Sequence, residues 1–171
     1  MAMPPREVVD RINNVQQARG WIISSYSQIE YFLGDIITKS MEMPEYADID
    51  GRLPHGASKR IRRVRQILKK EGFYSQFSKE IAEVIDEFSA HQDVRNLLAH
   101  GYADVQHDAN NNILCTFRKW HRNQENEDVE LVETFFPIHL AYVSEQMKQL
   151  SQRSLTVFRA THDALGLVGN D

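Results

Sequence analysis

The sequence predicts a mainly α-helical protein with a small β element before its last helix. Apolar residues recur at helical spacing in four segments, and the spacing changes to that of a strand after Gly101. Glycines and prolines lie between several of these segments, where a chain turns. We therefore expect an antiparallel four-helix bundle with a short β hairpin or three-stranded sheet inserted at residues 102–135, all in a single domain over residues 1–171.

The first two predicted helices are separated by a long loop. Helical spacing of apolar residues runs through residues 5–39. Residues 41–56 interrupt it with two prolines and two glycines, which is typical of a loop. A second helix is predicted at residues 58–71, because its apolar residues keep helical spacing until Gly72, a residue that favours a helix end.

The third predicted helix leads directly into the β element. It covers residues 75–100, and Gly101 is placed to terminate it. Strand-like alternation follows at residues 102–107 and 113–120, with turn-forming residues at 108–112 between them. These two segments predict a hairpin.

The end of the chain adds a third short strand and the last helix. Residues 129–135 again show strand-like composition after a polar, acidic stretch. Pro137 suits the first turn of a helix, and helical spacing then continues to Gly166.

Composition restricts the classes of function. The net charge of -4 argues against a surface that coats nucleic acid generally, so any affinity for RNA must be local. A single cysteine excludes an internal disulfide. The sequence contains neither the apolar run of a signal peptide nor a stretch of membrane-spanning length, so we expect a soluble, cytoplasmic protein with no membrane partner.

The most informative segment closes the third predicted helix. It reads Arg95-Asn96-Leu97-Leu98-Ala99-His100-Gly101. An arginine keeps its charge near neutral pH whereas histidine changes charge there, so the pair supplies a fixed cation for a phosphate and a proton carrier. Asn96 and His100 are four residues apart and share a helix face, whereas Arg95 lies about 140° of rotation from His100. Its side chain must therefore wrap round the helix, or the helix must be irregular.

A structural role for the same residues stays open. Histidine in the last turn of a helix favours the helix dipole and bonds the final carbonyls, and an arginine beside it can pair with a carboxylate.

The pattern Arg95-Asn96-x-x-Ala99-His100-Gly101 resembles the signature of the HEPN superfamily, small helical-bundle proteins of prokaryotic toxin–antitoxin, antiphage and CRISPR-associated nuclease systems. Its Arg-x(4 to 6)-His spacing occurs at this one place in the chain. The resemblance implies a homodimer in which two copies of the motif form one positively charged cleft. It further implies that Arg95 holds the scissile phosphate, that His100 moves the proton and that Asn96 orients the phosphate or the imidazole.

The second predicted helix is strongly basic in an otherwise acidic chain. Its candidate RNA-binding residues are Lys59, Arg60, Arg62, Arg63, Arg65 and Lys69. They form either a track for RNA phosphates or a solvated face that pairs with the acidic segment 125–133, and the sequence favours neither. Aromatic residues are not interleaved with them, which disfavours a base-stacking surface on this helix.

Five other polar positions have ordinary interpretations. Glu30 lies beside an apolar face of the first helix and is a candidate to orient a motif side chain, although an exposed or salt-bridged carboxylate is the more common role. His91 is interpreted as a core or interface histidine, and Cys115 as a packed thiol. Asp48 and Asp50 lie in the long loop, where they suit a turn or solubility.

No cofactor or metal is expected, because metal-ligand, phosphate-loop and nucleophile-elbow motifs are absent from the sequence. By the resemblance, the chain is a metal-independent endoribonuclease of a toxin–antitoxin or antiphage system, whose partners are RNA, a second copy and an antitoxin or regulatory protein. The alternative is a non-catalytic helical interaction or regulatory module of such a system. A nuclease needs Arg95 and His100 exposed, whereas a scaffold can bury them in pairs with carboxylates.

Overall fold

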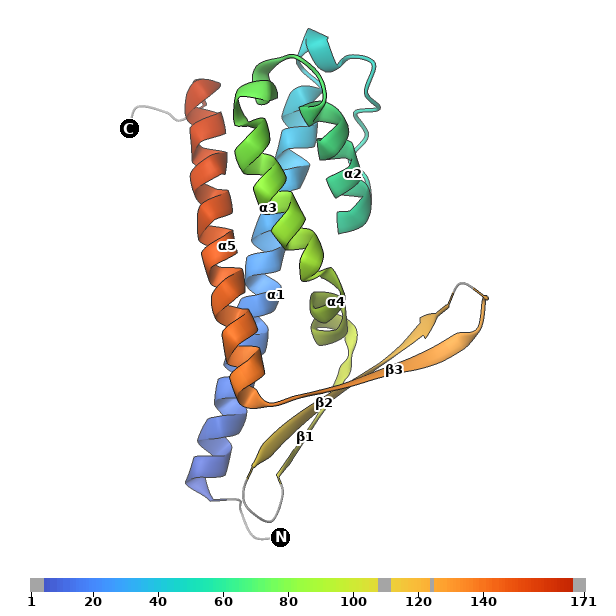
Figure 1. Cartoon of the computed structure of the whole chain (residues 1–171), viewed down its shortest axis with the longest axis vertical. Coiled ribbons are helices and arrows are strands. Elements are labelled where there is room, and N and C mark those ends of the chain that lie inside the picture. The colour runs from blue at the N-terminus through green and yellow to red at the C-terminus, as the bar shows by residue number, and fades with distance from the viewer. Residues whose placement is uncertain (1–4, 108–111, 124, 168–171) are drawn as a thin grey trace. The chain divides into compact units, whose positions relative to one another are not determined.

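The protein is mainly helical, with a three-stranded antiparallel sheet before its last helix, as the sequence predicts. We describe a computed structural model at residues 5–107, 112–123 and 125–167 (Figure 1). Among these residues, five α-helices and three strands are present. The α-helices are α1 (Arg6–Ser40), α2 (Ala57–Leu68), α3 (Ser78–Ala90), α4 (Gln92–His100) and α5 (Pro137–Ala164), and the strands are β1 (Tyr102–His107), β2 (Ile113–Arg122) and β3 (Asp128–Phe135).

The first two helices are close to their predicted ranges. In α1, buried residues recur at helical spacing, including Val8, Val15 and Ile22. The loop after it contains a short 3-10 helix, η1 (Pro44–Tyr46), in which Pro44 occupies the first turn. Helix α2 ends three residues earlier than predicted, and a second 3-10 helix, η2 (Phe73–Phe77), begins directly after Gly72.

The predicted third helix is wrong as a single element, because the chain breaks it into α3 and α4. The break lies at His91, whose φ of -97° and ψ of 2° fall in the bridge region between helix and strand. The backbone N–H of Arg95 still donates to the carbonyl of His91 at 3.0 Å, so α4 starts immediately. Neither glycine nor proline marks this position, and the apolar spacing continues through it.

The sheet has the order β1-β2-β3, with antiparallel pairing throughout (Figure 1). Strand β1 has its predicted bounds, and the other two strands contain their predicted ranges. The predicted turn at 108–112 lies outside the described residues except for Asn112. On the first half of β2, the side chains of Ile113, Cys115 and Phe117 are buried, so this face packs on the core, whereas β3 is exposed along its length up to Phe135.

Helix α5 begins at Pro137 as predicted and ends just before Gly166. The φ of Gly166 is +67°, a left-handed conformation that glycine adopts readily at the end of a helix. The backbone N–H of Leu167 donates to the carbonyl of His162 at 3.0 Å and satisfies one of the terminal carbonyls.

The internal contacts group the chain into two compact units. Unit 1 comprises Met1–Ser24 and His91–Lys148, and it contains α4 and the sheet. Unit 2 comprises Ser25–Ala90 and Gln149–Asp171, and it contains α2 and α3. The side chains of Tyr26 and Phe88, whose ring centroids lie 4.0 Å apart, form part of the core of unit 2. Across the described ranges, no helix has both the length and the apolar character needed to cross a membrane.

Candidate functional site

The candidate site in unit 1 is the polar side of helix α4. His100 is exposed, and Arg95 and Asn96 are half-buried. The neighbouring Leu97 and Leu98 are buried, and they anchor the opposite side of the helix. The short helix therefore exposes the imidazole of His100, keeps the side chains of Arg95 and Asn96 partly covered, and is held in place by its leucines.

Arg95 reaches its neighbour Asn96 with its side chain. Its Nη1 donates a hydrogen bond to Oδ1 of Asn96 over 3.1 Å. The helix is regular from Gln92 to His100, so the side chain accounts for the rotation between Arg95 and His100. Because Asn96 and His100 share a face of the helix, this hydrogen bond directs the Arg95 guanidinium toward that face. An amide oxygen orients a guanidinium without carrying a compensating charge.

Arg19 of α1 holds the C-terminal end of α4. Its Nε donates to the backbone carbonyl of Leu98 at 2.7 Å, and its Nη2 donates to that of Gly101 at 3.4 Å. The last carbonyls of a helix lack partners within the helix, and a guanidinium that satisfies two acceptors stabilises the end. The two carbonyls flank His100, so Arg19 fixes the backbone from which the imidazole projects.

Phe117 of β2 lies against the other side of Arg19. The carbon atom at the centre of the guanidinium lies 5.5 Å from the centroid of the Phe117 ring, which is the geometry of a cation–π contact. Sequence reasoning missed Arg19, although a signal was present. It stands four residues after Val15 and three before Ile22, on the buried stripe of α1, where a charged residue requires a partner.

Gly101 joins the motif helix to the sheet through close backbone contacts. Its φ of -81° and ψ of 144° are extended, so the helix does not end in the left-handed conformation common at such glycines. A Cβ atom at this position would lie 2.5 Å from the carbonyl oxygen of Leu97 and 3.3 Å from that of Arg118. The glycine is therefore required by space and not by its torsion angles.

The basic residues of α2 lie in unit 2, and Arg60 is engaged by the backbone. Its Nε donates to the carbonyl of Pro54 and its Nη1 to the carbonyl of Glu30, both at 3.1 Å. The carboxylate of Glu30 lies 4.0 Å from the same Nη1. The structure thus shows the salt-bridged role that the sequence allowed for Glu30, in unit 2, whereas the motif belongs to unit 1.

Two further α2 residues form ion pairs with carboxylates of unit 2. Arg63 lies 3.3 Å from Asp50, and Arg65 lies 2.7 Å from Asp86. Lys70, just beyond the helix, pairs with Asp48. The acidic segment 125–133, which the sequence offered as one alternative partner, supplies none of these three ion pairs; their carboxylates come from the loop after α1 and from α3.

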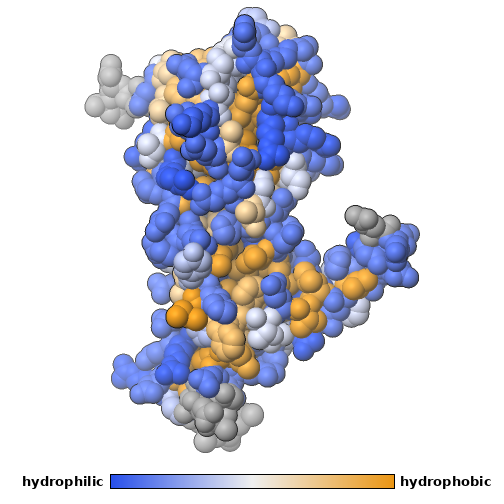
Figure 2. All heavy atoms as spheres, viewed as in Figure 1, coloured by the Kyte–Doolittle hydropathy of each residue, from blue (hydrophilic) through white to orange (hydrophobic). Residues whose placement is uncertain are grey.

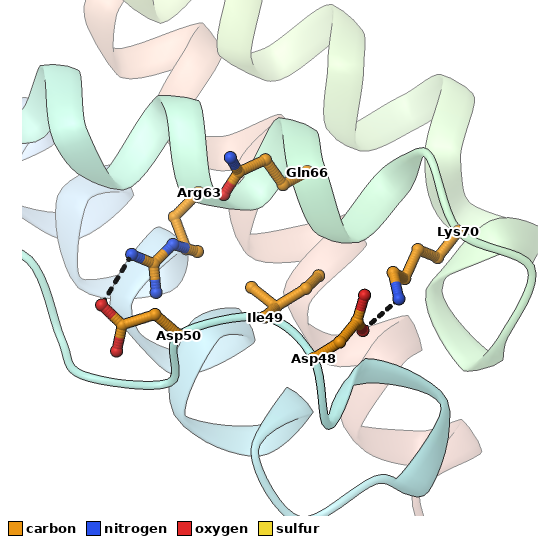
Figure 3. A pocket seen from close by; sticks show the side chains of 6 residues that line it. All are labelled: Asp48, Ile49, Asp50, Arg63, Gln66 and Lys70. Atoms are coloured by element: carbon orange, nitrogen blue, oxygen red, sulfur yellow. Dashed lines mark hydrogen bonds and ion pairs between the residues drawn. The ribbon is translucent and has the colours of Figure 1, made fainter.

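The loop carboxylates and α2 enclose a cavity of about 390 Å³ (Figure 3). Arg63 points to Asp50 and Lys70 to Asp48, at the two sides of Ile49. The hydrogen bond from Lys70 lowers the pKa of Asp48, and hydrogen bonds from Arg52 hold the pKa of Asp50 far below its usual range. These aspartates serve the turn and its ion pairs, in agreement with the sequence interpretation.

The remaining candidate residues of α2 face solvent. Lys59, Arg62 and Lys69 are exposed and take part in no ion pair among the residues that the structure describes. A groove of about 370 Å³ is lined by Arg62, Arg65 and Lys69 together with Ser58, Ile61 and Gln66. The predicted phosphate track therefore has fewer cations available to a phosphate than the number of basic residues in the sequence suggests.

Cys115 is fully buried in the sheet, and burial raises the pKa of its thiol. This confirms its interpretation as a packed thiol. His91 is half-buried at the break between α3 and α4. Within the described ranges, no group of three or more histidine, cysteine or acidic residues is placed to hold a metal ion.

Comparison of the chain with protein-family models, with curated proteins and with solved structures finds no match.

Proposed function

We propose that this chain is a HEPN-type endoribonuclease that cleaves RNA by transphosphorylation at Arg95, Asn96 and His100. The observation that carries the proposal is the hydrogen bond from Arg95 to Asn96, which brings a guanidinium to the helix side of an exposed imidazole. A phosphate-binding cation and a proton carrier on one surface are the groups that metal-independent RNA cleavage requires. The motif's resemblance to HEPN proteins supports the same function.

The proposed reaction uses these groups in defined roles. The 2'-oxygen of the RNA attacks the adjacent phosphorus, and the bond from phosphorus to the 5'-oxygen breaks. His100 takes the proton from the 2'-hydroxyl, and a protonated histidine supplies one to the leaving 5'-oxygen. Arg95 stabilises the charge that develops on the phosphoryl oxygens, and Asn96 keeps the guanidinium of Arg95 in position.

A homodimer completes the proposed site. One imidazole cannot be both deprotonated and protonated in the same step, whereas two copies of His100 across a two-fold axis supply a base and an acid. We further propose that the helices form an antiparallel four-helix bundle of HEPN type and that this bundle is the unit that dimerises. RNA is the substrate, and an antitoxin or regulatory protein is the further partner that the resemblance suggests in a toxin–antitoxin or antiphage system.

An RNA-cleavage assay in excess EDTA tests the proposal. We expect the wild type to cut single-stranded RNA and leave 2',3'-cyclic phosphate and 5'-hydroxyl ends, while DNA of the same sequence survives because it lacks the nucleophile. Removal of a positioned proton carrier costs on the order of 100-fold to 10,000-fold in rate, so His100→Ala should nearly abolish cleavage. Arg95→Ala should have a similar effect, because it removes phosphate stabilisation.

His107→Ala is the matched control, because this histidine is also exposed in unit 1 but lies at the far end of β1. It should cleave at the wild-type rate. Retention of full activity in a folded His100→Ala variant would contradict the proposal, as would inactivity of the wild type toward varied RNAs.

A non-catalytic interaction module is the second candidate. The observation that favours it is the exposure of Val129, Leu131 and Val132 on β3, which forms one edge of the sheet. An exposed apolar edge strand is a surface on which another chain can pair. Inactivity toward RNA together with stable binding of a protein partner at β3 would favour this function.

A further inference from the structure

The solvent-facing side of the sheet carries two exposed aromatic rings with an arginine between them. The side chains of Tyr102 and Trp120 are 70% and 69% exposed. Tyr102 of β1 is paired directly with Arg118 of β2, and Trp120 follows Arg118 by two residues on the same strand. Paired residues and residues two apart point to the same face of a sheet. We call these three residues the aromatic face.

The aromatic face lies opposite the buried side of the sheet. The residues of β2 that alternate with Arg118 and Trp120 include Phe117, which is fully buried. Tyr102 and Arg118 therefore lie opposite a packed part of the sheet, whereas Trp120 lies where both faces of the β2–β3 ribbon are largely exposed. Hydrophobic and hydrophilic side chains are interspersed over the sheet at the right of Figure 2.

We propose that the aromatic face binds unpaired nucleotides of an RNA strand, with bases stacked on Tyr102 and Trp120 and a phosphate held by Arg118. This inference rests on the proposed function and names the form of RNA that the site takes. Tyr102 follows His100 by two residues, so the face begins where the motif helix ends. An RNA strand that leaves the motif meets the aromatic face next.

The arrangement of the face favours nucleotides over a protein partner. Diagonal neighbours on a sheet lie roughly 7–8 Å apart, so the two rings are separated and each presents its own surface to a base. Polar groups lie on the same face, including the Thr116 and Thr134 hydroxyls, which lie 3.0 Å apart, and the exposed apolar Val132 is paired with Arg118. Protein interfaces concentrate contiguous apolar area in their centres, whereas single-strand binding surfaces combine separate aromatic platforms with cations.

Glu130 competes with a phosphate for Arg118. Its Oε2 lies 3.8 Å from Nη1 of Arg118, and both side chains are partly exposed. Exposed pairs of this kind contribute little, so a phosphate can displace the carboxylate. Replacement of the carboxylate by an amide should therefore strengthen RNA binding, which is the opposite of what loss of a structural ion pair would do.

The chain supplies its own reporter, because Trp21 and Trp120 are its two tryptophans. In a Trp21→Phe variant that also carries His100→Ala, the fluorescence of Trp120 is followed during titration with a 2'-O-methylated single-stranded oligonucleotide. Stacking should quench the emission saturably. The Tyr102→Ala substitution should weaken binding by about 5-fold to 150-fold, and Glu130→Gln should strengthen it by about two-fold to five-fold.

Two controls make the result specific. Tyr142→Ala removes another exposed ring of unit 1, on α5, and should leave affinity unchanged. A fully paired RNA duplex should bind more weakly, because its bases are not available for stacking. Anisotropy of a labelled oligonucleotide with a Trp120→Ala variant provides a readout that is independent of the fluorophore.

The outcomes separate this inference from the proposed function. Saturable quenching by single strands supports the inference even if the wild type never cleaves RNA. Cleavage by the wild type without any response of Trp120, or with unchanged affinity in both Tyr102→Ala and Trp120→Ala, overturns the inference and leaves the catalytic proposal standing. Equal binding of duplex and single strand also overturns it.

Discussion

Helix α2 in unit 2 and helix α4 in unit 1 both carry arginines, but they hold them differently. On α2, Arg63 and Arg65 contact carboxylates, and Arg60 contacts backbone carbonyls and a carboxylate. On α4, Arg95 contacts the amide of Asn96. A carboxylate competes with a phosphate for a guanidinium, whereas an amide orients it. On α2, the number of cations therefore says little about how many of them can bind a phosphate.

The largest effect is expected from a carboxylate placed directly beside Arg95. Asn96→Asp replaces the amide oxygen with a carboxylate that pairs with Arg95. We expect the cleavage rate to fall by about 100-fold to 1000-fold, the typical cost of removing one electrostatic interaction from a transition state. Single-turnover kinetics measure it, and circular dichroism checks the fold. A rate within a few-fold of wild type would show that the neutrality of Asn96 is unimportant.

The second prediction concerns the support of the motif helix. Arg19→Met keeps an apolar stem but removes the hydrogen bonds to the carbonyls of Leu98 and Gly101. We expect the free energy of unfolding to fall by about 1–3 kcal/mol, because two half-buried carbonyls are left without a charged donor. Urea unfolding measures the change. Arg6→Met, on an exposed position of the same helix, is the comparison, and an equal effect there would contradict the assigned role.

Two matched triple variants sharpen the contrast on α2 itself. The first variant neutralises the exposed Lys59, Arg62 and Lys69. It should reduce the slope of log RNA affinity against log salt concentration by roughly 0.7 for each phosphate that the variant no longer binds. Neutralisation of Arg60, Arg63 and Arg65 should change the slope less, because carboxylates and carbonyls already occupy them. Filter binding at several salt concentrations measures both slopes. If both triple variants and the wild type have equal slopes, the basic side chains of α2 do not bind RNA phosphates and form only a solvated face.

The smallest expected effect is the titration of Asp50. Hydrogen bonds from Arg52 and Arg63 lower its pKa below the ordinary value of about 3.9. A lowered pKa contributes stability that is present above the ordinary value and is lost as the pH falls through the folded-state pKa. NMR of the Asp50 carboxyl carbon should show a midpoint below the ordinary one. Arg52→Gln should raise the midpoint, and an unchanged midpoint would show that the interaction is absent in solution.

Much of the secondary structure follows from local pattern. Strand β1 has its predicted bounds, and α5 starts at Pro137 as predicted, because both depend on alternation and on residues with strong backbone preferences. The break at His91 was not predictable in this way, since no glycine or proline marks it and the apolar spacing continues across it. The candidate motif could likewise be found by its residue types and spacing.

The helical class, the position of the sheet and the candidate residues Arg95, Asn96 and His100 can be read from the sequence, because each depends on neighbours within a few positions. The three-dimensional packing was needed to show which cations are engaged, that Arg19 holds the end of the motif helix and that Tyr102, Arg118 and Trp120 share an exposed face. Those features join residues far apart along the chain, such as Arg19 and Leu98. Their pairing depends on the packing of the core and not on local periodicity.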